Sequence, residues 1–364
     1  MLETVNAYAS IFGWLGYNVH ARNFFGALDR YVRVCLIPKY PNFHGFPLTT
    51  DLRRMMGRRK TMKLSSPAVC LSHGNEMHSF TGSRMVGYTV FETDRVAPDW
   101  INLLNQLDQV WTASHWGVNV LVESGVSEKR VRCVPEGVDT TVFRPKPVVR
   151  KRKEPDVFRF LSVGKFEPRK GQAELLRAYA EEFGPDEPVR LSLLAHNPHH
   201  ADFEPHREIE KLALPPHPPI ECLAPRLTAH DLANLYNLCD AFVLPTKGEG
   251  WGLPVIEAMA CGLPAIVTNH SGVTEYANDV NAYMIGIDGM EEASDPIFHP
   301  HSGTHGRWAR PSFTELKRLM RHVVTHRAEA EERGARAAAD MKDKWSWDCA
   351  ARAAFDLLRE LCEQ

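Results

Sequence analysis

Short apolar runs rich in β-branched residues alternate with helix-length stretches along most of the chain. In the first half these runs occupy residues 5–12, 32–37, 67–71, 85–92, 109–114 and 131–135. In the second half they occupy residues 158–164, 191–196, 220–224, 241–245, 265–268 and 282–287. Strands separated by helices predict β-α-β units and parallel sheets. Two such series predict two doubly wound domains, with ligands at the carboxyl ends of the strands.

The two series are separated by a segment without apolar periodicity. Residues 145–156 (PKPVVRKRKEPD) contain three prolines and a run of four basic residues, which is typical of an interdomain linker. Helices are predicted at 312–324, where Ser312 and Glu315 have capping-box spacing, and at 347–364. Residues 291–311 are interpreted as an irregular excursion.

Composition narrows the class of protein. The length of 364 residues suits two domains, and the net charge of −2 argues against a general nucleic-acid binder. The eight cysteines are scattered without a C-x-x-C pair, which favours reduced thiols in a cytoplasmic protein. The first residues do not resemble a signal peptide, and no run approaches the roughly 18 apolar residues of a membrane span. Any membrane contact is therefore expected to be peripheral, at the inner face.

The most informative stretch is EGWGLPVIE at residues 249–257. It follows the apolar run 241–245 and predicts a glycine-rich turn that opens a short helix, with Pro254 in its first turn and Gly262 just past its end. Backbone N–H groups at such a helix start form an anion site, and flanking glycines let a phosphate approach. The residues expected to supply these groups are Gly250, Trp251, Gly252 and Leu253.

Two carboxylates bracket this turn. Glu249 precedes the predicted helix and Glu257 lies inside it, so they are expected to be about 10 Å apart at 1.5 Å per helical residue. A retaining hydrolase pair needs about 5 Å, whereas the two ends of a sugar nucleotide suit the larger span. Ionised carboxylates there would accept hydrogen bonds from hydroxyls of the sugar and of the ribose. The alternative is a capped surface helix with two incidental glutamates.

Four ordered segments make the chain resemble the retaining glycosyltransferases of family 4, with their E-x7-E signature. These segments are 134–145, 160–179, 227–246 and 248–276. The resemblance implies the GT-B fold, an α/β architecture of two doubly wound Rossmann-like domains facing a central cleft. The expected division is an acceptor-side domain at 1–148, rejoined by a C-terminal helix at 343–364, a linker at 149–156, and a nucleotide-sugar-binding domain at 157–342.

The resemblance also implies roles for individual residues. Glu249 would contact the donor sugar and Glu257 the ribose, while Lys170, with Arg169 or Lys165 as its companion, would neutralise the diphosphate. Fixed cations are also expected on chemical grounds, because negative charge develops on the leaving diphosphate. The alternative for each base is a solvated surface charge.

The segment 11–29 resembles the family's first glycine loop, which faces the donor phosphates. Gly16 matches that loop best, whereas Gly13 only loosely replaces the usual glycine pair. Glycine turns after a first strand are also common for steric reasons.

The chain departs from the family pattern at two places. Glu136 stands where the family usually has Asn, and Glu92 stands where a histidine is expected, with His73 and His20 as other candidates. Glu92 could stabilise an oxocarbenium-like transition state, accept a hydrogen bond from a sugar hydroxyl, or be a structural carboxylate paired with Arg95. Retaining transfer of this type is thought to use the leaving phosphate as base, so the missing histidine does not exclude activity.

Metal chemistry is not expected. The histidines of HPHSGTH (299–305) lie in an apparent loop, and the chain contains no Asp-x-Asp, so the resemblance implies a metal-independent enzyme with the nucleotide sugar as co-substrate and no cofactor. The segment 52–64 carries six basic residues and three methionines. It could contact an anionic acceptor or an acidic membrane, or it could be a solvated, mobile loop.

The sequence therefore predicts a retaining hexosyltransferase that moves a sugar from a nucleoside-diphosphate sugar to a hydroxyl acceptor, in glycan, polysaccharide or glycolipid biosynthesis. Two alternatives stay open: a sugar-nucleotide epimerase of GT-B fold, and a catalytically inactive glycosyltransferase-like subunit.

Overall fold

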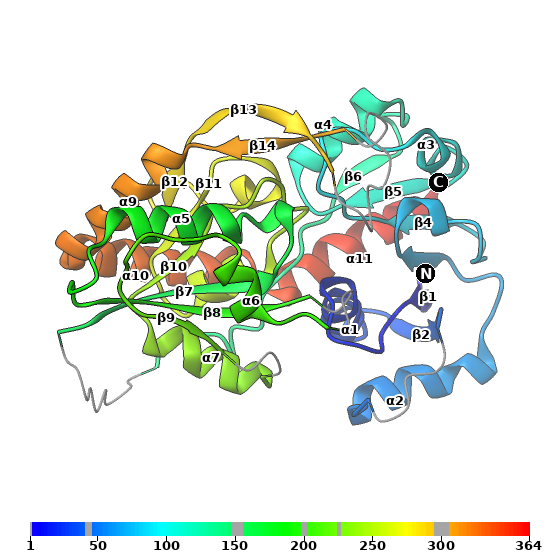
Figure 1. Cartoon of the computed structure of the whole chain (residues 1–364). Coiled ribbons are helices and arrows are strands. Elements are labelled where there is room, and N and C mark those ends of the chain that lie inside the picture. Colours follow the sequence, from blue (N-terminus) through cyan, green and yellow to red (C-terminus); the bar gives the residue numbers. More distant parts are fainter. Residues whose placement is uncertain (1, 41–45, 147–155, 198–201, 224–226, 295–305) are drawn as a thin grey trace. The chain divides into compact units, whose positions relative to one another are not determined.

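The computed structural model describes residues 2–40, 46–146, 156–197, 202–223, 227–294 and 306–364 (Figure 1). The chain forms two compact units. The N-terminal unit contains residues 1–139 together with 344–364, and the C-terminal unit contains residues 140–343. Most of the predicted linker, residues 149–155, lies outside the described residues.

The N-terminal unit is built on a six-stranded parallel sheet of order β2-β1-β3-β4-β5-β6. Its strands match the predicted apolar runs: β1 Thr4–Ala9, β2 Arg33–Pro38, β3 Ala68–Leu71, β4 Met85–Tyr88, β5 Gln109–Thr112 and β6 Val131–Cys133. β1 is paired so that Ala9 lies opposite Pro38 on one side and Leu71 on the other, and Leu71 lies opposite Tyr88. Four strands therefore end at the same level of the sheet.

The helices of this unit begin and end at residues that favour such positions. They are α1 Gly16–Leu28, α2 Thr50–Gly57, α3 Pro98–Leu104, α4 His115–Ser124 and α11 Trp347–Glu363, with 3-10 turns at Arg58–Thr61 and Gly74–Glu76. Ser114 and Ser346 cap α4 and α11 by accepting hydrogen bonds from backbone N–H groups. α11 packs against α1 through buried residues at helical spacing, including Ala354 and Leu358.

The C-terminal unit contains a second six-stranded parallel sheet, of order β12-β11-β10-β7-β8-β9. Its strands again match the predicted runs: β7 Phe158–Lys165, β8 Val189–His196, β9 Ile220–Cys222, β10 Ala241–Leu244, β11 Ala265–Thr268 and β12 Tyr283–Ile285. The central strands β10 and β11 are buried at every position. Continuous apolar runs are what a parallel sheet covered on both faces requires.

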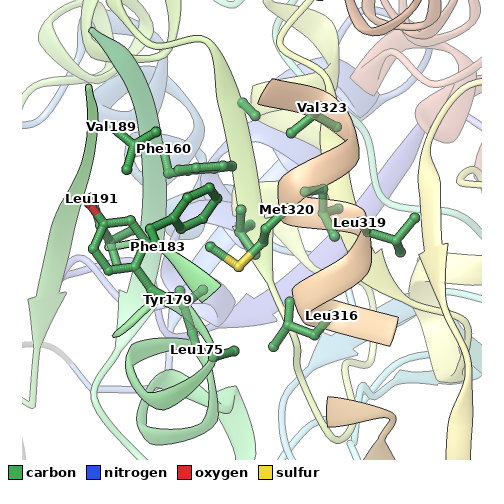
Figure 2. Packing of buried hydrophobic residues seen from close by; sticks show 14 of the residues in the cluster. Phe160, Leu175, Tyr179, Phe183, Val189, Leu191, Leu316, Leu319, Met320 and Val323 are labelled. Atoms are coloured by element: carbon green, nitrogen blue, oxygen red, sulfur yellow. The ribbon is translucent and has the colours of Figure 1, made fainter. Parts of the chain in front are cut away.

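Helices cover both faces of this sheet. They are α5 Gln172–Glu182, α6 Pro205–Glu210, α7 Ala229–Leu238, α8 Leu253–Ala260, α9 Phe313–Thr325 and α10 Arg327–Lys344, with 3-10 turns at Pro168–Lys170 and Ser271–Glu275. One core cluster joins β7 and β8 to α5 and α9. Figure 2 shows Met320 of α9 directed toward Phe183, with Tyr179 of α5 nearby.

Two predictions for the region after β12 are wrong. The segment 291–311 is not irregular at its described ends, because β13 Ile287–Glu292 and β14 Arg307–Pro311 form an antiparallel pair. Ser312 precedes α9 but makes no capping side-chain hydrogen bond. The Glu315 carboxylate does not complete a capping box; it accepts a hydrogen bond from the Gly286 N–H at 2.6 Å.

The length and apolarity that a membrane-crossing helix needs are not combined in any helix of the described residues.

Candidate functional site

The loop between β10 and α8 adopts the predicted turn and helix start. α8 begins at Leu253, Pro254 lies in its first turn, and Gly262 follows its end with φ +74°. Gly252 precedes the helix with φ +92°, and a Cβ there would lie 2.9 Å from Val273 Cγ1. Glycine is required at this position, because the backbone conformation and the close neighbour both exclude larger residues.

The start of α8 offers backbone donors. The N–H of Val255 is bonded to the Gly252 carbonyl. In the part of the chain that the structure describes, the N–H groups of Gly252 and Leu253 donate no hydrogen bond. They can therefore bind an anion. The Trp251 side chain is buried and packs against Tyr276, with ring centroids 4.9 Å apart, and so it fixes the loop.

Glu249 is held at the centre of a buried network of hydrogen bonds. Glu249 is only 4% exposed. Its Oε1 accepts hydrogen bonds from Lys170 Nζ at 2.6 Å and from Thr246 Oγ1 at 3.0 Å. Arg169 Nη1 lies 3.5 Å from the same oxygen. Burial by itself would raise the pKa of Glu249, but the cations of Lys170 and Arg169 and the hydrogen bonds outweigh it and lower that pKa. Glu249 is therefore ionised.

The cations come from the end of β7 and the 3-10 turn that follows it. Lys165 is the last residue of β7, and Arg169 and Lys170 end the turn Pro168–Lys170. Gly171 has φ +71°, and a Cβ there would lie 2.1 Å from the Pro245 carbonyl oxygen. Only glycine permits this approach, which brings the turn against the β10–α8 loop. Burial lowers the pKa of Lys170, and Glu249 opposes that shift.

Glu167 is a buried carboxylate that the sequence argument missed. Its Oε1 accepts from Arg169 Nη2 at 2.7 Å, and its Oε2 lies 3.0 Å from Lys165 Nζ. Arg169 Nη1 also donates to the Gly248 carbonyl at 2.6 Å. Burial would raise the pKa of Glu167, but the neighbouring cations lower it. An acid placed between bases in KFEPRK was the signal that could have indicated this residue.

A second missed group lies in the loop after β11. Glu249 donates its backbone N–H to Ser271 Oγ at 2.9 Å, and the Gly272 N–H donates to the Glu249 carbonyl at 2.8 Å. Ser271 has φ +62°, a conformation that non-glycine residues rarely adopt, and a Cβ on Gly272 would lie 2.1 Å from the Gly250 carbonyl oxygen. This loop therefore fixes the backbone on both sides of Glu249.

Glu257 has a different environment. It is the fifth residue of α8, is half-buried, and accepts a hydrogen bond from the Tyr236 hydroxyl of α7 at 3.3 Å. Burial raises its pKa to about 8, with the Tyr236 hydrogen bond opposing the rise. The structure thus brings Arg169 and Lys170 to Glu249, whereas Lys165 pairs with Glu167. Burial therefore favours the protonated form of Glu257, which the sequence analysis treated as an ionised acceptor.

The remaining predicted residues belong to the N-terminal unit. Gly16 is the first residue of α1, is exposed, and has no atom within 4 Å of where a Cβ would lie. Glu92 is half-buried in the loop after β4. His20 is buried on α1, with Nδ1 3.4 Å from Glu136 Oε1, and burial lowers its pKa to about 3, so it is neutral. His73 follows β3 and lies against Tyr17, with ring centroids 4.5 Å apart.

The basic segment 52–64 is largely helical, so its interpretation as a mobile loop is wrong. α2 buries Leu52 and Met55 against the unit. Arg54 forms ion pairs with Asp51 at 2.9 Å and with Asp29 at 3.0 Å, and Arg58 also contacts Asp29. Part of the basic charge therefore has a structural role. The histidines of 299–305 lie outside the described residues.

Comparisons with known proteins show similarity to glycosyltransferases. Residues 145–293 match the family description "Glycosyl transferases group 1". The chain is 27% identical over 224 residues to a D-inositol 3-phosphate glycosyltransferase of Acidothermus cellulolyticus, which covers 59% of this chain and 47% of that protein. It is 33% identical over 130 residues to a serotype-specific mannosyltransferase of Escherichia coli, covering 36% of this chain and 13% of that protein. The chain thus spans less than half the length of these relatives.

Solved structures match over nearly the whole chain. Sucrose-phosphate synthase from Thermosynechococcus elongatus has a TM-score of 0.74 at 16% identity, covering 99% of both chains. Anabaena Alr3699/HepE, solved with UDP and glucose, has a TM-score of 0.70 at 15% identity, covering 98% of this chain and 100% of that one. The likeness is one of fold, and it confirms the predicted fold class of two doubly wound Rossmann-like domains, as in GT-B proteins.

Proposed function

We propose that this chain is a retaining, metal-independent glycosyltransferase that moves a sugar from a nucleoside-diphosphate sugar to a hydroxyl acceptor. The observation that carries the proposal is the buried cluster of Lys170, Arg169 and Glu249 beside the start of α8. This cluster lies within the residues that match the glycosyltransferase description. Cations and helix N–H groups suit a diphosphate, and a carboxylate beside them suits a sugar hydroxyl.

In this proposal the C-terminal unit binds the donor. The N–H groups of Gly252 and Leu253 and the ammonium of Lys170 hold the diphosphate, with Arg169 or Lys165 as a second cation. Glu249 accepts a hydrogen bond from the transferred sugar, and Glu257 contacts the ribose. Because negative charge grows on the diphosphate as the glycosidic bond breaks, fixed cations at this place stabilise the transition state more than the ground state.

The proposed reaction balances without a metal or a cofactor. The bond between the anomeric carbon and the diphosphate oxygen breaks, and a bond from that carbon to the acceptor oxygen forms on the same face. The acceptor's proton passes to the leaving diphosphate oxygen. Glu92 in the N-terminal unit is proposed to support the positive charge on the reacting sugar.

The names of similar proteins suggest where to begin. The Anabaena structure contains UDP and glucose, and another structure of the same protein contains UDP-glucose. We therefore propose a UDP-sugar as the first donor to test. The relatives named as mannosyltransferase and inositol-phosphate glycosyltransferase support a role in glycan, polysaccharide or glycolipid synthesis. A cytoplasmic location remains part of the proposal.

The experiment measures products from UDP-glucose, UDP-N-acetylglucosamine, GDP-mannose and ADP-glucose in the presence of a chelator. NMR of the anomeric proton identifies the product, and a new α-linked glycoside is expected. Glu249→Gln is expected to slow transfer by about 10²–10³ while nucleoside diphosphate still binds. Glu221→Gln is the matched control, because its carboxylate pairs with Arg190 on the β8–β9 edge.

Three results would contradict the proposal. A β-linked product would exclude retention, and an epimerised or hydrolysed nucleotide sugar without a glycoside would indicate the epimerase alternative. Binding of donors without any turnover would indicate an inactive subunit.

A further inference from the structure

Two exposed aromatic side chains lie in loops that leave the same edge of the N-terminal sheet. β1 and β2 end level with each other at Ala9 and Pro38. Trp14 lies in the loop that leaves β1 and is 61% exposed, and Tyr40 lies in the loop that leaves β2 and is 56% exposed. Neighbouring strands are about 4.8 Å apart, so these loops leave the sheet side by side. Large exposed aromatic side chains at the carboxyl edge of a doubly wound sheet indicate a binding surface.

Tyr40 is anchored in its exposed position. Its hydroxyl donates a hydrogen bond to Glu76 Oε1 at 2.8 Å. Glu76 Oε2 in turn accepts from Lys39 Nζ at 3.1 Å and is bonded to Ser72, which follows β3. The polar end of the ring is therefore linked through Glu76 to the end of β3, which lies on the other side of β1 from β2. A ring held in this way loses little conformational entropy when a ligand binds to its face.

Trp14 is anchored by a different set of contacts. Its ring lies 5.1 Å from the ring of Phe46, with an interplanar angle of 51°. The Arg22 guanidinium lies 4.7 Å above the Phe46 ring and donates to the carbonyls of Ile11 and Gly13, both at 2.7 Å. The glycine loop and the two aromatic rings are thus fixed by one arginine. We call Trp14, Tyr40 and Phe46 the aromatic rim.

We propose that the aromatic rim binds the acceptor and that this acceptor is a saccharide; the inference rests on the proposed function. A pyranose ring has an apolar face of C–H groups, which carry positive partial charge. The face of an aromatic ring is negative, so the two stack favourably. The hydroxyls at the edge of the same sugar need hydrogen-bonding partners, and the rim has them close by.

The polar neighbours of the rim suit sugar hydroxyls. Burial would raise the pKa of Glu76, but hydrogen bonds from Ser72, Tyr40 and Lys39 lower it to about 2, so its carboxylate is ionised at neutral pH. It is partly exposed, whereas Lys39 is nearly buried. An anchored carboxylate next to an exposed aromatic face provides the polar and apolar contacts that a saccharide requires. An acyl chain has no polar groups that could form hydrogen bonds with Glu76 or Lys39.

The test measures binding of the full chain, saturated with UDP, to a panel of immobilised mono- and disaccharides. At least one saccharide is expected to bind, and Trp14→Ala and Tyr40→Ala should each weaken that binding by tenfold or more. Trp14→Phe should restore most of the affinity, because it keeps an aromatic face. Leu64→Ala is the matched control: Leu64 is also 61% exposed but precedes β3, at the opposite edge of the sheet.

The inference fails if no saccharide binds while UDP does, or if Trp14→Ala binds as well as the parent. Melting curves exclude unfolding as the cause of a loss. UDP binding, followed by thermal shift, reports on the donor site alone. The parent could also fail to bind UDP and still bind a saccharide in a way that depends on Trp14. That result would reject the proposed donor chemistry but would support the saccharide site.

Discussion

The buried ion pair between Lys170 and Glu249 leads to a prediction about stability. Lys170 is 7% exposed and Glu249 is 4% exposed, with 2.6 Å between Nζ and Oε1. Removing one partner of a buried pair costs about 3–5 kcal/mol, because the other charge stays buried without compensation. Arg169 remains 3.5 Å from Glu249 and compensates in part. We therefore expect Lys170→Met to destabilise the C-terminal unit by about 3 kcal/mol.

For a domain of about 200 residues, such as the C-terminal unit, 1 kcal/mol corresponds to about 2–4 °C in Tm. Lys170→Met should therefore lower Tm by about 6–12 °C. Calorimetry suits the measurement, because two units need not unfold together. Lys317→Met, which breaks a surface pair with Glu181, is the control and should change Tm little.

Two further readouts separate the ion pair from a loss of packing. Adding Glu249→Gln to Lys170→Met should recover part of the stability, since no unpaired carboxylate then remains. Without Lys170, the pKa of Glu249 is expected to rise above its value in the parent, because only Arg169 and the Thr246 hydrogen bond then oppose the effect of burial. The penalty of Lys170→Met should therefore shrink as the pH falls and Glu249 takes up a proton. Additive effects of the two substitutions, or a penalty independent of pH, would refute the reasoning.

Two other predictions concern charge. Because burial raises the pKa of Glu257 to about 8, its contribution to stability is complete below about pH 4.5 and is lost as the pH rises toward 8. The Tm of Glu257→Gln should therefore rise relative to the Tm of the parent as the pH increases from about 4.5 to about 8. A Tm difference that stays constant with pH would contradict the assignment. Arg59, Lys60 and Lys63 form no ion pair within the described residues. Replacing them with Gln should therefore weaken the free energy of binding to anionic vesicles by about 1 kcal/mol each, as measured by co-sedimentation. Arg54→Gln, which instead breaks the Asp29 pair, should mainly lower Tm, and equal sedimentation of parent and triple variant would exclude this contact.

The strands could be predicted because the parallel sheets are covered on both faces. Such strands consist of continuous apolar residues, and β10 and β11 are buried throughout. The pair β13–β14 was missed for the opposite reason. Residues 287–292 are mostly half-buried or exposed and include three acids and Gly289, so no apolar run marks the strand. Their partner strand β14 comes after a stretch of sequence that has no regular alternation of apolar and polar residues.

The candidate site was found in part. A local motif identifies Lys170 and Glu249 separately, but their contact spans 79 residues of sequence. Thr246 and Ser271 were missed because small hydroxyl residues in loops carry no signal of their own. Their importance comes from the place where β10 and β11 end next to each other. The state of Glu257 also depends on a distant partner, Tyr236, and on burial that only the folded chain creates.

The pairing of Lys170 with Glu249 also explains how one cluster can serve two states of the proposed reaction. Lys165, Arg169 and Lys170 carry three positive charges, and Glu167 and Glu249 carry two negative ones, so the cluster has a net charge of +1. Without a donor, Glu249 keeps Lys170 compensated. A diphosphate would take over Lys170 and leave Glu249 with hydrogen-bonding capacity for the sugar, while Glu167 still holds Arg169 in place. The carboxylate that stabilises the unliganded fold is then the group that the transferred sugar meets.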